Sequence, residues 1–157
     1  MKYLLSSMVL GVSFVVGGTW PGAIALESPF HLSQITESVE GSWQLVGWGD
    51  PDNLTPPVDG TEVTAVFEGD RLGGSGGCNR YTSTYTSTDG TLKIGPTAAT
   101  RRACQSPVGE QEFQYFRALE GVETYRITED GQLELAYETE AGGGVLLFSR
   151  AAIPALW

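Results

Sequence analysis

A glycine-rich segment followed by two widely spaced cysteines constrains this chain more than any other feature. Residues 73–81 read Gly-Gly-Ser-Gly-Gly-Cys-Asn-Arg-Tyr, and residues 99–104 read Ala-Thr-Arg-Arg-Ala-Cys. Cys78 and Cys104 are the only cysteines in the sequence. Glycines inside a strand pattern mark a bulge, a sharp bend or a close backbone contact. The segment therefore predicts a bent strand in a small β-structure.

The same glycines could instead cradle a phosphate group, but their spacing argues against this. A dinucleotide fingerprint that starts at Gly74 and Gly76 requires a third glycine where this chain has Asn79. A P-loop requires a lysine directly after a glycine, and neither Lys2 nor Lys93 follows one. We therefore expect no nucleotide and no other cofactor.

The N-terminus has the pattern of an export signal. Lys2 precedes an apolar run over residues 4–16, and residues 23–25 (Ala-Ile-Ala) place small side chains where a signal peptidase cleaves. The run is shorter than the roughly 18 apolar residues that a membrane-spanning helix requires. The prediction is a signal peptide over residues 1–25 and a protein exported to the periplasm or the extracellular space, with no transmembrane anchor after cleavage.

The chain is strongly acidic, with 9 basic and 19 acidic side chains and a net charge of −10. Cleavage of the signal peptide would remove Lys2 and no acid, so the mature chain would carry −11. Such a charge repels phosphate backbones and anionic lipid headgroups. We therefore expect no nucleic-acid partner, and the remaining length fits one domain with its own core.

Alternation of apolar and polar residues predicts a domain built mostly from antiparallel strands. After an arm over residues 26–40 and apart from a loop over 49–60, strand patterns lie at 42–48, 63–67, 71–74, 81–88, 91–94, 122–128, 132–137 and 145–149. Tight turn signals such as Asp89-Gly90 join them. Repeated strand–helix–strand units are missing, which disfavours a parallel sheet. We expect an α+β, mostly β fold: a strongly curved antiparallel sheet or partly open β-barrel with one α-helix packed on it.

One helix is predicted at residues 107–119. Ser106 is expected to cap it, Pro107 suits its first turn, and Gly121 would end it. Its apolar face is expected to comprise Val108, Glu112, Tyr115, Phe116 and Leu119, widened by Phe113. Aromatic residues at this spacing indicate a core face rather than a cofactor site.

Catalytic patterns are weak in this sequence. A serine or cysteine triad needs a histidine base, and the single histidine, His31, lies in the predicted arm. Zinc sites built from histidine and cysteine need more of these residues than the chain contains. Two carboxylate pairs, Glu110 with Glu112 and Glu134 with Glu138, keep a hydrolase open as an alternative. In so acidic a chain, chance proximity is the better explanation of such pairs.

The segments around the two cysteines resemble the META domain family, also described as HslJ-like. The matching residues are 77–81, 99–104, 110–113, Leu119, Tyr125 and 133–135, and the opening 41–45 also fits. The resemblance implies a META domain over residues 41–150, with a tail over 151–157. It also implies a small exported domain, mostly antiparallel β, with no established catalysis. Some members of the family are lipoproteins, but the signal segment here has no cysteine to carry a lipid.

Export and this resemblance together give the cysteines and their neighbours an expected role. Two and only two cysteines, both inside family-like motifs, are expected to form a disulfide, Cys78–Cys104, in an oxidising compartment. The alternative is two separate thiols, one of them buried.

If the cysteines pair, Arg80, Arg101 and Arg102 would gather beside them, close to Asn79. Their guanidinium forks, together with Asn79, are candidates for contact with an anion or another ligand. The alternative is that they tie strand ends to carboxylates or backbone carbonyls.

The expectation for function is a non-enzymatic, exported META domain protein with a role in envelope maintenance or stress tolerance. One alternative is a small barrel that binds a hydrophobic ligand or peptide between helix and sheet, and the other is the carboxylate-pair hydrolase. The expected partner is thus an envelope protein or a hydrophobic ligand. A roomy apolar cavity would favour the binder and two converging carboxyls the hydrolase, whereas a filled core would favour neither.

Overall fold

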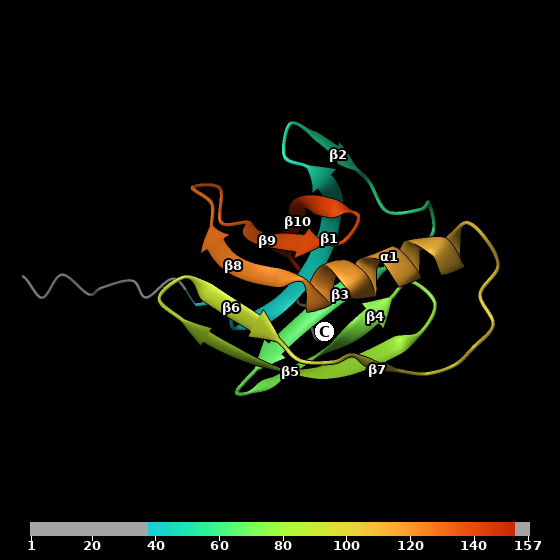
Figure 1. Cartoon of the computed structure of the whole chain (residues 1–157), viewed down its shortest axis with the longest axis horizontal. Coiled ribbons are helices and arrows are strands. Elements are labelled where there is room, and N and C mark those ends of the chain that lie inside the picture. The colour runs from blue at the N-terminus through green and yellow to red at the C-terminus, as the bar shows by residue number, and fades with distance from the viewer. Residues whose placement is uncertain (1–37, 153–157) are drawn as a thin grey trace, which may run out of the picture. The chain divides into compact units, whose positions relative to one another are not determined.

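Eight antiparallel strands close into a barrel in the computed structural model, which describes residues 38–152 (Figure 1). The barrel strands are β1 (Gly41–Asp50), β3 (Val63–Glu68), β4 (Arg71–Gly76), β5 (Arg80–Thr88), β6 (Thr91–Ile94), β8 (Val122–Ile127), β9 (Leu133–Thr139) and β10 (Gly142–Arg150). They pair in the order β10-β9-β8-β6-β5-β4-β3-β1, and β1 pairs back to β10. The predicted signal peptide, most of the arm with His31, and most of the tail lie outside the described residues.

The predicted fold class is confirmed, and the barrel is closed rather than partly open. Closure between β6 and β8 rests on one residue pair, Thr91 with Thr124. Two short strands lie in segments where none was expected. The predicted loop 49–60 contains β2 (Asn53–Thr55), which pairs with the end of β1, and β7 (Ala98–Ala99) pairs with β5. Strands of two or three residues are too short to show a period.

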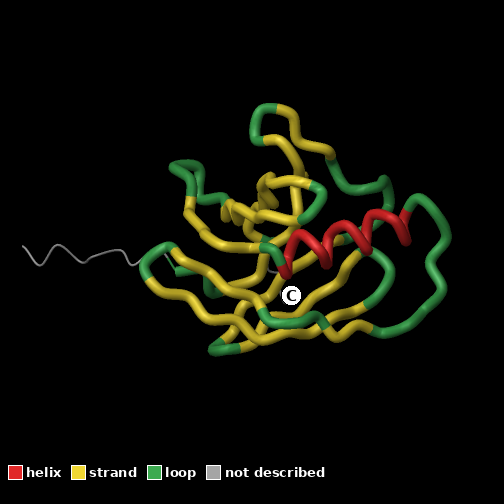
Figure 2. Tube along the Cα trace, viewed as in Figure 1, coloured by secondary structure: helices red, strands yellow, loops and turns green. Residues whose placement is uncertain are grey.

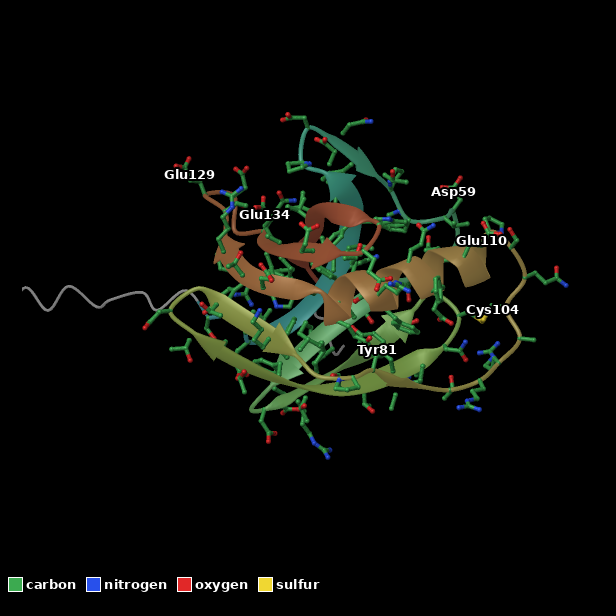
Figure 3. All side chains as sticks on the ribbon, viewed as in Figure 1. Asp59, Tyr81, Cys104, Glu110, Glu129 and Glu134 are labelled. Atoms are coloured by element: carbon green, nitrogen blue, oxygen red, sulfur yellow. A yellow bond between two sulfur atoms is a disulfide. The ribbon has the colours of Figure 1, made fainter. Side chains whose placement is uncertain are left out.

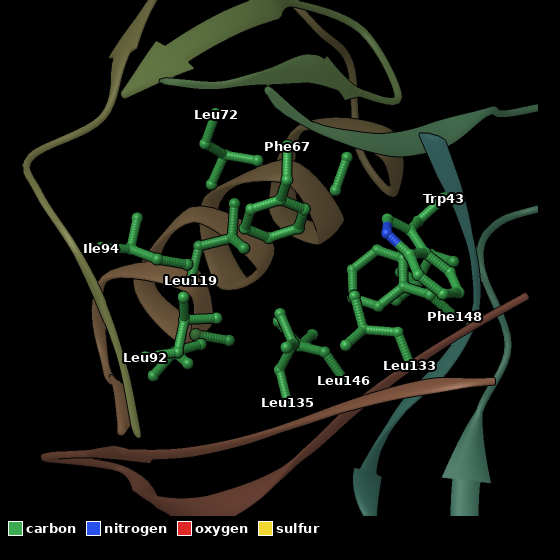
Figure 4. Packing of buried hydrophobic residues seen from close by; sticks show 14 of the residues in the cluster. Trp43, Phe67, Leu72, Leu92, Ile94, Leu119, Leu133, Leu135, Leu146 and Phe148 are labelled. Carbon is green, nitrogen blue, oxygen red and sulfur yellow. The ribbon is translucent and has the colours of Figure 1, made fainter. Parts of the chain in front are cut away.

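Alternate side chains of β1, β3 and β6 are buried. In β3, Val63, Ala65 and Phe67 are buried, and Val66 between them is exposed. The largest fully buried side chains are Trp43, Tyr81, Tyr115, Phe67, Phe148, Leu72, Leu92, Leu119, Leu133, Leu135, Leu146 and Val39. Figure 4 shows this cluster filling the space enclosed by the strands. Val39, at the end of the predicted arm, therefore belongs to the core.

Helix α1 (Val108–Glu120) crosses one end of the barrel (Figure 2). The helix contacts β4 and β9, two strands that are separated by three others in the strand order. Tyr115 and Leu119 are fully buried and reach the core. Among the described residues, no helix has the length and apolar character needed to cross a bilayer.

The predicted apolar face of α1 is wrong in one respect: Phe113 is 63% exposed. Phe116 is only partly buried, whereas the polar residues Gln111 and Glu112 are buried. The helix is therefore rotated so that its first turn presents amide and carboxyl groups to the barrel. Those groups find hydrogen-bond partners there, which removes the cost of burying them.

The predicted cap of α1 also differs from the structure. Pro107 occupies the N-cap position and no side chain caps the helix. The Ser106 hydroxyl instead donates to the Glu110 carboxylate at 2.8 Å. At the other end the helix stops at Gly121 as predicted. A Cβ at this position would overlap the carbonyl oxygen of Glu138, so the close approach of β9 requires glycine.

Candidate functional site

The two cysteines form a disulfide, which confirms the expected pairing. The sulfurs of Cys78 and Cys104 lie 1.96 Å apart and the Cα atoms 6.3 Å apart. The bond joins the turn between β4 and β5 to the segment that leads into α1 (Figure 3). It leaves no free thiol in the chain, because the sequence has no other cysteine.

Asn79 is buried beside the disulfide and uses its whole side-chain amide for internal hydrogen bonds. Its Oδ1 accepts from the Thr100 hydroxyl at 2.7 Å and from the backbone N–H of Arg102 at 2.8 Å. Its Nδ2 donates to Glu112 Oε1 at 2.7 Å and to the sulfur of Cys104 at 3.2 Å. Asn79 therefore holds the segment after β7 in place from inside the protein.

Glu112 is the helix residue that binds the turn between β4 and β5. Its Oε2 accepts the backbone N–H of Asn79 at 2.5 Å and that of Cys78 at 3.2 Å, in addition to the side-chain bond from Asn79. Only 7% of Glu112 is exposed. N–H donors can stabilise a buried carboxylate in this way, and here they join the glycine-rich turn to the first turn of α1.

Gln111, the neighbouring residue, ties a second loop to the helix. Its Oε1 accepts the backbone N–H of Val58 at 2.5 Å, and its Nε2 donates to the Thr61 hydroxyl at 3.1 Å. We call Gln111, Glu112, Asn79 and the disulfide the polar lock. The polar side chains of the lock have hydrogen-bond partners within the protein, so the lock serves to hold the structure together.

Two tyrosines continue the contact of α1 with the barrel. The Tyr81 hydroxyl donates to the carbonyl oxygen of Thr64 at 2.9 Å and accepts a hydrogen bond from the Tyr115 hydroxyl, also at 2.9 Å. Burial raises the pKa of both phenols well above the ordinary value of 10.0. A hydroxyl that stays protonated and bonded in this way serves to hold the helix rather than to transfer protons.

The structure leaves the three predicted arginines exposed, on backbone segments that lie next to each other. Arg80 begins β5, and Arg101 and Arg102 follow β7. The backbone N–H of Thr100 donates to the carbonyl of Arg80 at 3.0 Å, which places the two segments side by side. Within residues 38–152, no ion pair or side-chain hydrogen bond engages any of the three guanidinium groups.

A groove of about 590 Å³ lies between α1 and the hairpin of β9 and β10. Aromatic side chains of Trp48, Phe113 and Tyr137 line it, with Arg117 and Glu140 at its polar edge. The Arg117 guanidinium lies 5.8 Å from the Phe113 ring centre and 3.5 Å from the Glu140 carboxylate. We call this the helix groove.

The two carboxylate pairs considered for hydrolysis have separate partners. Glu110 is exposed and bonded by Ser106, whereas Glu112 is buried in the polar lock. Glu134 receives both Nε and Nη2 of Arg126, at 2.7 and 2.6 Å. In the described part of the chain, no group of three histidine, cysteine, aspartate or glutamate side chains is arranged to hold a metal ion.

The chain is similar to a known family of proteins. The family model of the META domain matches residues 34–153. The chain belongs to the META domain family. The match extends beyond the predicted 41–150 and includes Val39, which the structure places in the core.

Solved structures share this META domain fold. A protein from Burkholderia xenovorans, solved by NMR, is 27% identical with a TM-score of 0.60, over 73% of this chain and 83% of that one. A second NMR structure is 20% identical with a TM-score of 0.52, over 70% of this chain and 88% of that one, and shows the fold alone. No curated protein matches the chain.

Two parts of the site were not foreseen in the sequence. Glu112 was predicted to lie on the apolar face of the helix, and Gln111 was given no role of its own. The one sequence feature that could have indicated a special role for Gln111 and Glu112 is that both lie in the family-like segment 110–113. A binding site between helix and sheet was one of the alternatives, but its lining residues were not predicted, because Trp48 and Tyr137 come from strands far apart in the sequence and no local pattern shows that they meet.

Proposed function

We propose that this protein is an exported, non-enzymatic binding domain that contributes to envelope maintenance by holding an apolar polypeptide segment in the helix groove. The observation that carries the proposal is Phe113. This large aromatic side chain is 63% exposed on a helix whose other aromatic residues pack inward, and it faces a groove shared with Trp48 and Tyr137. Clustered exposed apolar groups rimmed by polar ones are typical of binding sites.

The filled barrel supports a binding site at the surface rather than inside. Core side chains from β1, β3, β9 and β10 occupy the interior, and Trp43, Leu135, Leu146 and Phe148 are fully buried. A ligand held within the barrel would have to displace them. The groove beside α1 requires no such displacement.

The chemistry of the groove favours a peptide over a lipid chain. Its apolar rings lie next to Arg117, Thr139 and Glu140. Polar groups of this kind can satisfy backbone N–H and C=O groups of a bound polypeptide, whereas an alkyl chain offers them no partner and leaves them desolvated.

Non-enzymatic action is supported by the way the polar residues are used. The most buried carboxylate, Glu112, is occupied by three N–H donors, and Glu134 is bonded by Arg126. Export is supported by the disulfide, which persists in oxidising compartments, and by the signal pattern before residue 26.

N-acetyl-tryptophanamide, which carries an aromatic ring and two peptide groups, tests the groove directly. We expect this compound to shift the backbone amide NMR signals of Ala118, Gly142 and Gly143 in a saturable way. In Phe113→Ser these shifts should be absent. Val66→Ser is the matched control, because Val66 is also exposed but lies on the outer face of β3. Shifts scattered evenly over the barrel would contradict the proposal. Groove shifts with lauric acid but none with the amide would favour a lipid ligand instead.

The envelope role is tested in the native host. A deletion strain should admit a hydrophobic dye faster under heat or antibiotic stress, and the wild-type gene should restore the barrier. Phe113→Ser, and a chain lacking residues 2–25, should both fail to restore it while Val66→Ser succeeds. Full complementation by the chain without residues 2–25 would argue against export as part of the function.

A further inference from the structure

Three exposed arginines lie on neighbouring backbone segments beside the disulfide, and none of them belongs to the helix groove. Arg80, Arg101 and Arg102 are all exposed, and the hydrogen bond from Thr100 to Arg80 places β5 next to the segment that carries the other two. We call these three side chains the arginine surface. None of them lines the helix groove.

The arginine surface differs from most of the basic residues in the described domain. Four others each have a partner: Lys93 with Glu123, Arg117 with Glu140, Arg126 with Glu134, and Arg150 over the Trp43 ring at 4.4 Å. The three guanidinium groups have no carboxylate within 4.0 Å among residues 38–152. In a chain with 19 acids and 9 bases, three neighbouring unpaired arginines form a positive surface on an otherwise negative molecule.

The polar lock fixes the backbone under this surface. Asn79 Oδ1 holds the Arg102 N–H and the Thr100 hydroxyl, and Asn79 Nδ2 donates to the Arg102 carbonyl at 3.3 Å. The disulfide at Cys104 anchors the same segment two residues later. A partner therefore finds the backbone already ordered, which reduces the entropy lost on binding.

We propose that the arginine surface docks an acidic segment of a partner protein. Guanidinium forks bind carboxylates through paired N–H···O bonds. A hollow of about 740 Å³ on the outer face extends from Arg80 across β4 and offers the hydroxyl-bearing residues Thr64, Ser75 and Thr82. These groups can bond the backbone of an extended peptide.

A peptide fits the surrounding charge better than an anionic membrane. Glu62 lines the same hollow, and the chain as a whole carries −10. A flat anionic membrane would press against these acids as well as the arginines, and repulsion would offset the attraction. A narrow acidic segment in this hollow passes a single acid, Glu62.

Fluorescence anisotropy with a labelled peptide that carries glutamate at alternate positions tests the proposal. We expect saturable binding at low ionic strength that weakens about tenfold in the Arg101→Gln/Arg102→Gln double variant and further when Arg80→Gln is added. Lys93→Gln/Arg126→Gln is the matched control, because it removes two positive charges from exposed positions on β6 and β8, outside the hollow. At about 0.5 M salt, where screening is strong, the difference between variants should disappear.

Two further measurements distinguish recognition by the guanidinium fork from the effects of charge alone and of misfolding. Arg102→Lys keeps the charge but loses the planar fork, and we expect its affinity to fall between the wild type and Arg102→Gln. Unchanged circular dichroism melting would show that the variants fold. Equal binding by Arg101→Gln/Arg102→Gln and Lys93→Gln/Arg126→Gln would overturn the proposal, and so would binding to vesicles with anionic lipids but not to the peptide.

Discussion

The side-chain nitrogen of Asn79 lies 2.7 Å from a carboxylate oxygen of Glu112. This contact joins the turn after β4 to the first turn of α1, and both residues are buried. Because Asn79 also bonds the segment before the helix, one pair of side chains positions the helix across the end of the barrel. The position of α1 in turn forms one wall of the helix groove.

Glu112→Gln should destabilise the domain by about 1–3 kcal/mol. The amide side chain has one oxygen where the carboxylate has two, so its NH2 group would face the N–H donors of Cys78 and Asn79 and leave buried groups unpaired. Urea unfolding followed by tryptophan fluorescence measures the loss. Glu110→Gln is the control, because Glu110 is exposed on the same turn. Equal unfolding midpoints for the two variants would mean that the lock contributes little.

Strand periodicity accounts for most of what the sequence predicts correctly. Val63, Ala65 and Phe67 alternate with exposed residues, and their pattern identifies β3 without knowledge of its neighbours. Closure of the barrel was not predictable in this way. It depends on the pairing of β1 with β10, whose partners Trp43 and Arg150 lie at opposite ends of the domain sequence.

The helix shows where periodicity fails. The spacing of its aromatic residues placed Phe113 on the buried face, but burial was decided by the hydrogen bonds of Gln111 and Glu112. Those bonds involve Val58 and Asn79, which are more than 30 residues away. A pattern within one helix contains no information about such partners, so the lock and the groove emerged only from the tertiary structure.

Raising the pH above about 10 should unfold the domain progressively. Burial raises the pKa of Tyr81 and Tyr115, and burial together with Glu40 raises the pKa of Tyr85 to about 12. In the unfolded chain these phenols ionise near 10.0. A raised native pKa means that the stabilisation is complete below the unfolded pKa and is lost as the pH rises toward the native value.

The urea midpoint should therefore stay constant between about pH 7 and pH 9 and fall above about pH 10. Tyr115→Phe should reduce the slope of that fall, at a cost of about 1 kcal/mol near neutral pH for the lost hydrogen bond. A midpoint that does not change up to about pH 11 would contradict the buried, neutral state of these phenols.

Adjacent glycines in β4 should differ sharply in their tolerance of alanine. A Cβ at Gly74 would overlap the Thr64 carbonyl, the same oxygen that accepts the Tyr81 hydroxyl, so Gly74→Ala should cost about 1–3 kcal/mol. At Gly73 the nearest atom would be the Tyr81 carbonyl oxygen at 3.5 Å, an ordinary contact. Gly73→Ala should therefore change stability by less than about 0.5 kcal/mol. Equal urea midpoints for the two variants would show that β4 can shift away from β3.

Reduction of the Cys78–Cys104 disulfide should remove a large share of the stability of the domain. The cysteines are 26 positions apart, and closing a loop of this length is worth roughly 3–4 kcal/mol in the chain-entropy model. The urea midpoint should therefore fall in reducing buffer. A Cys78→Ala/Cys104→Ala variant should already have the lower midpoint and show no response to the reductant, which separates the disulfide from other effects of the reducing agent. Thiol titration of unreduced, denatured protein should find no free thiol, and two thiols per chain would contradict the disulfide and with it the anchored backbone beneath Arg101 and Arg102.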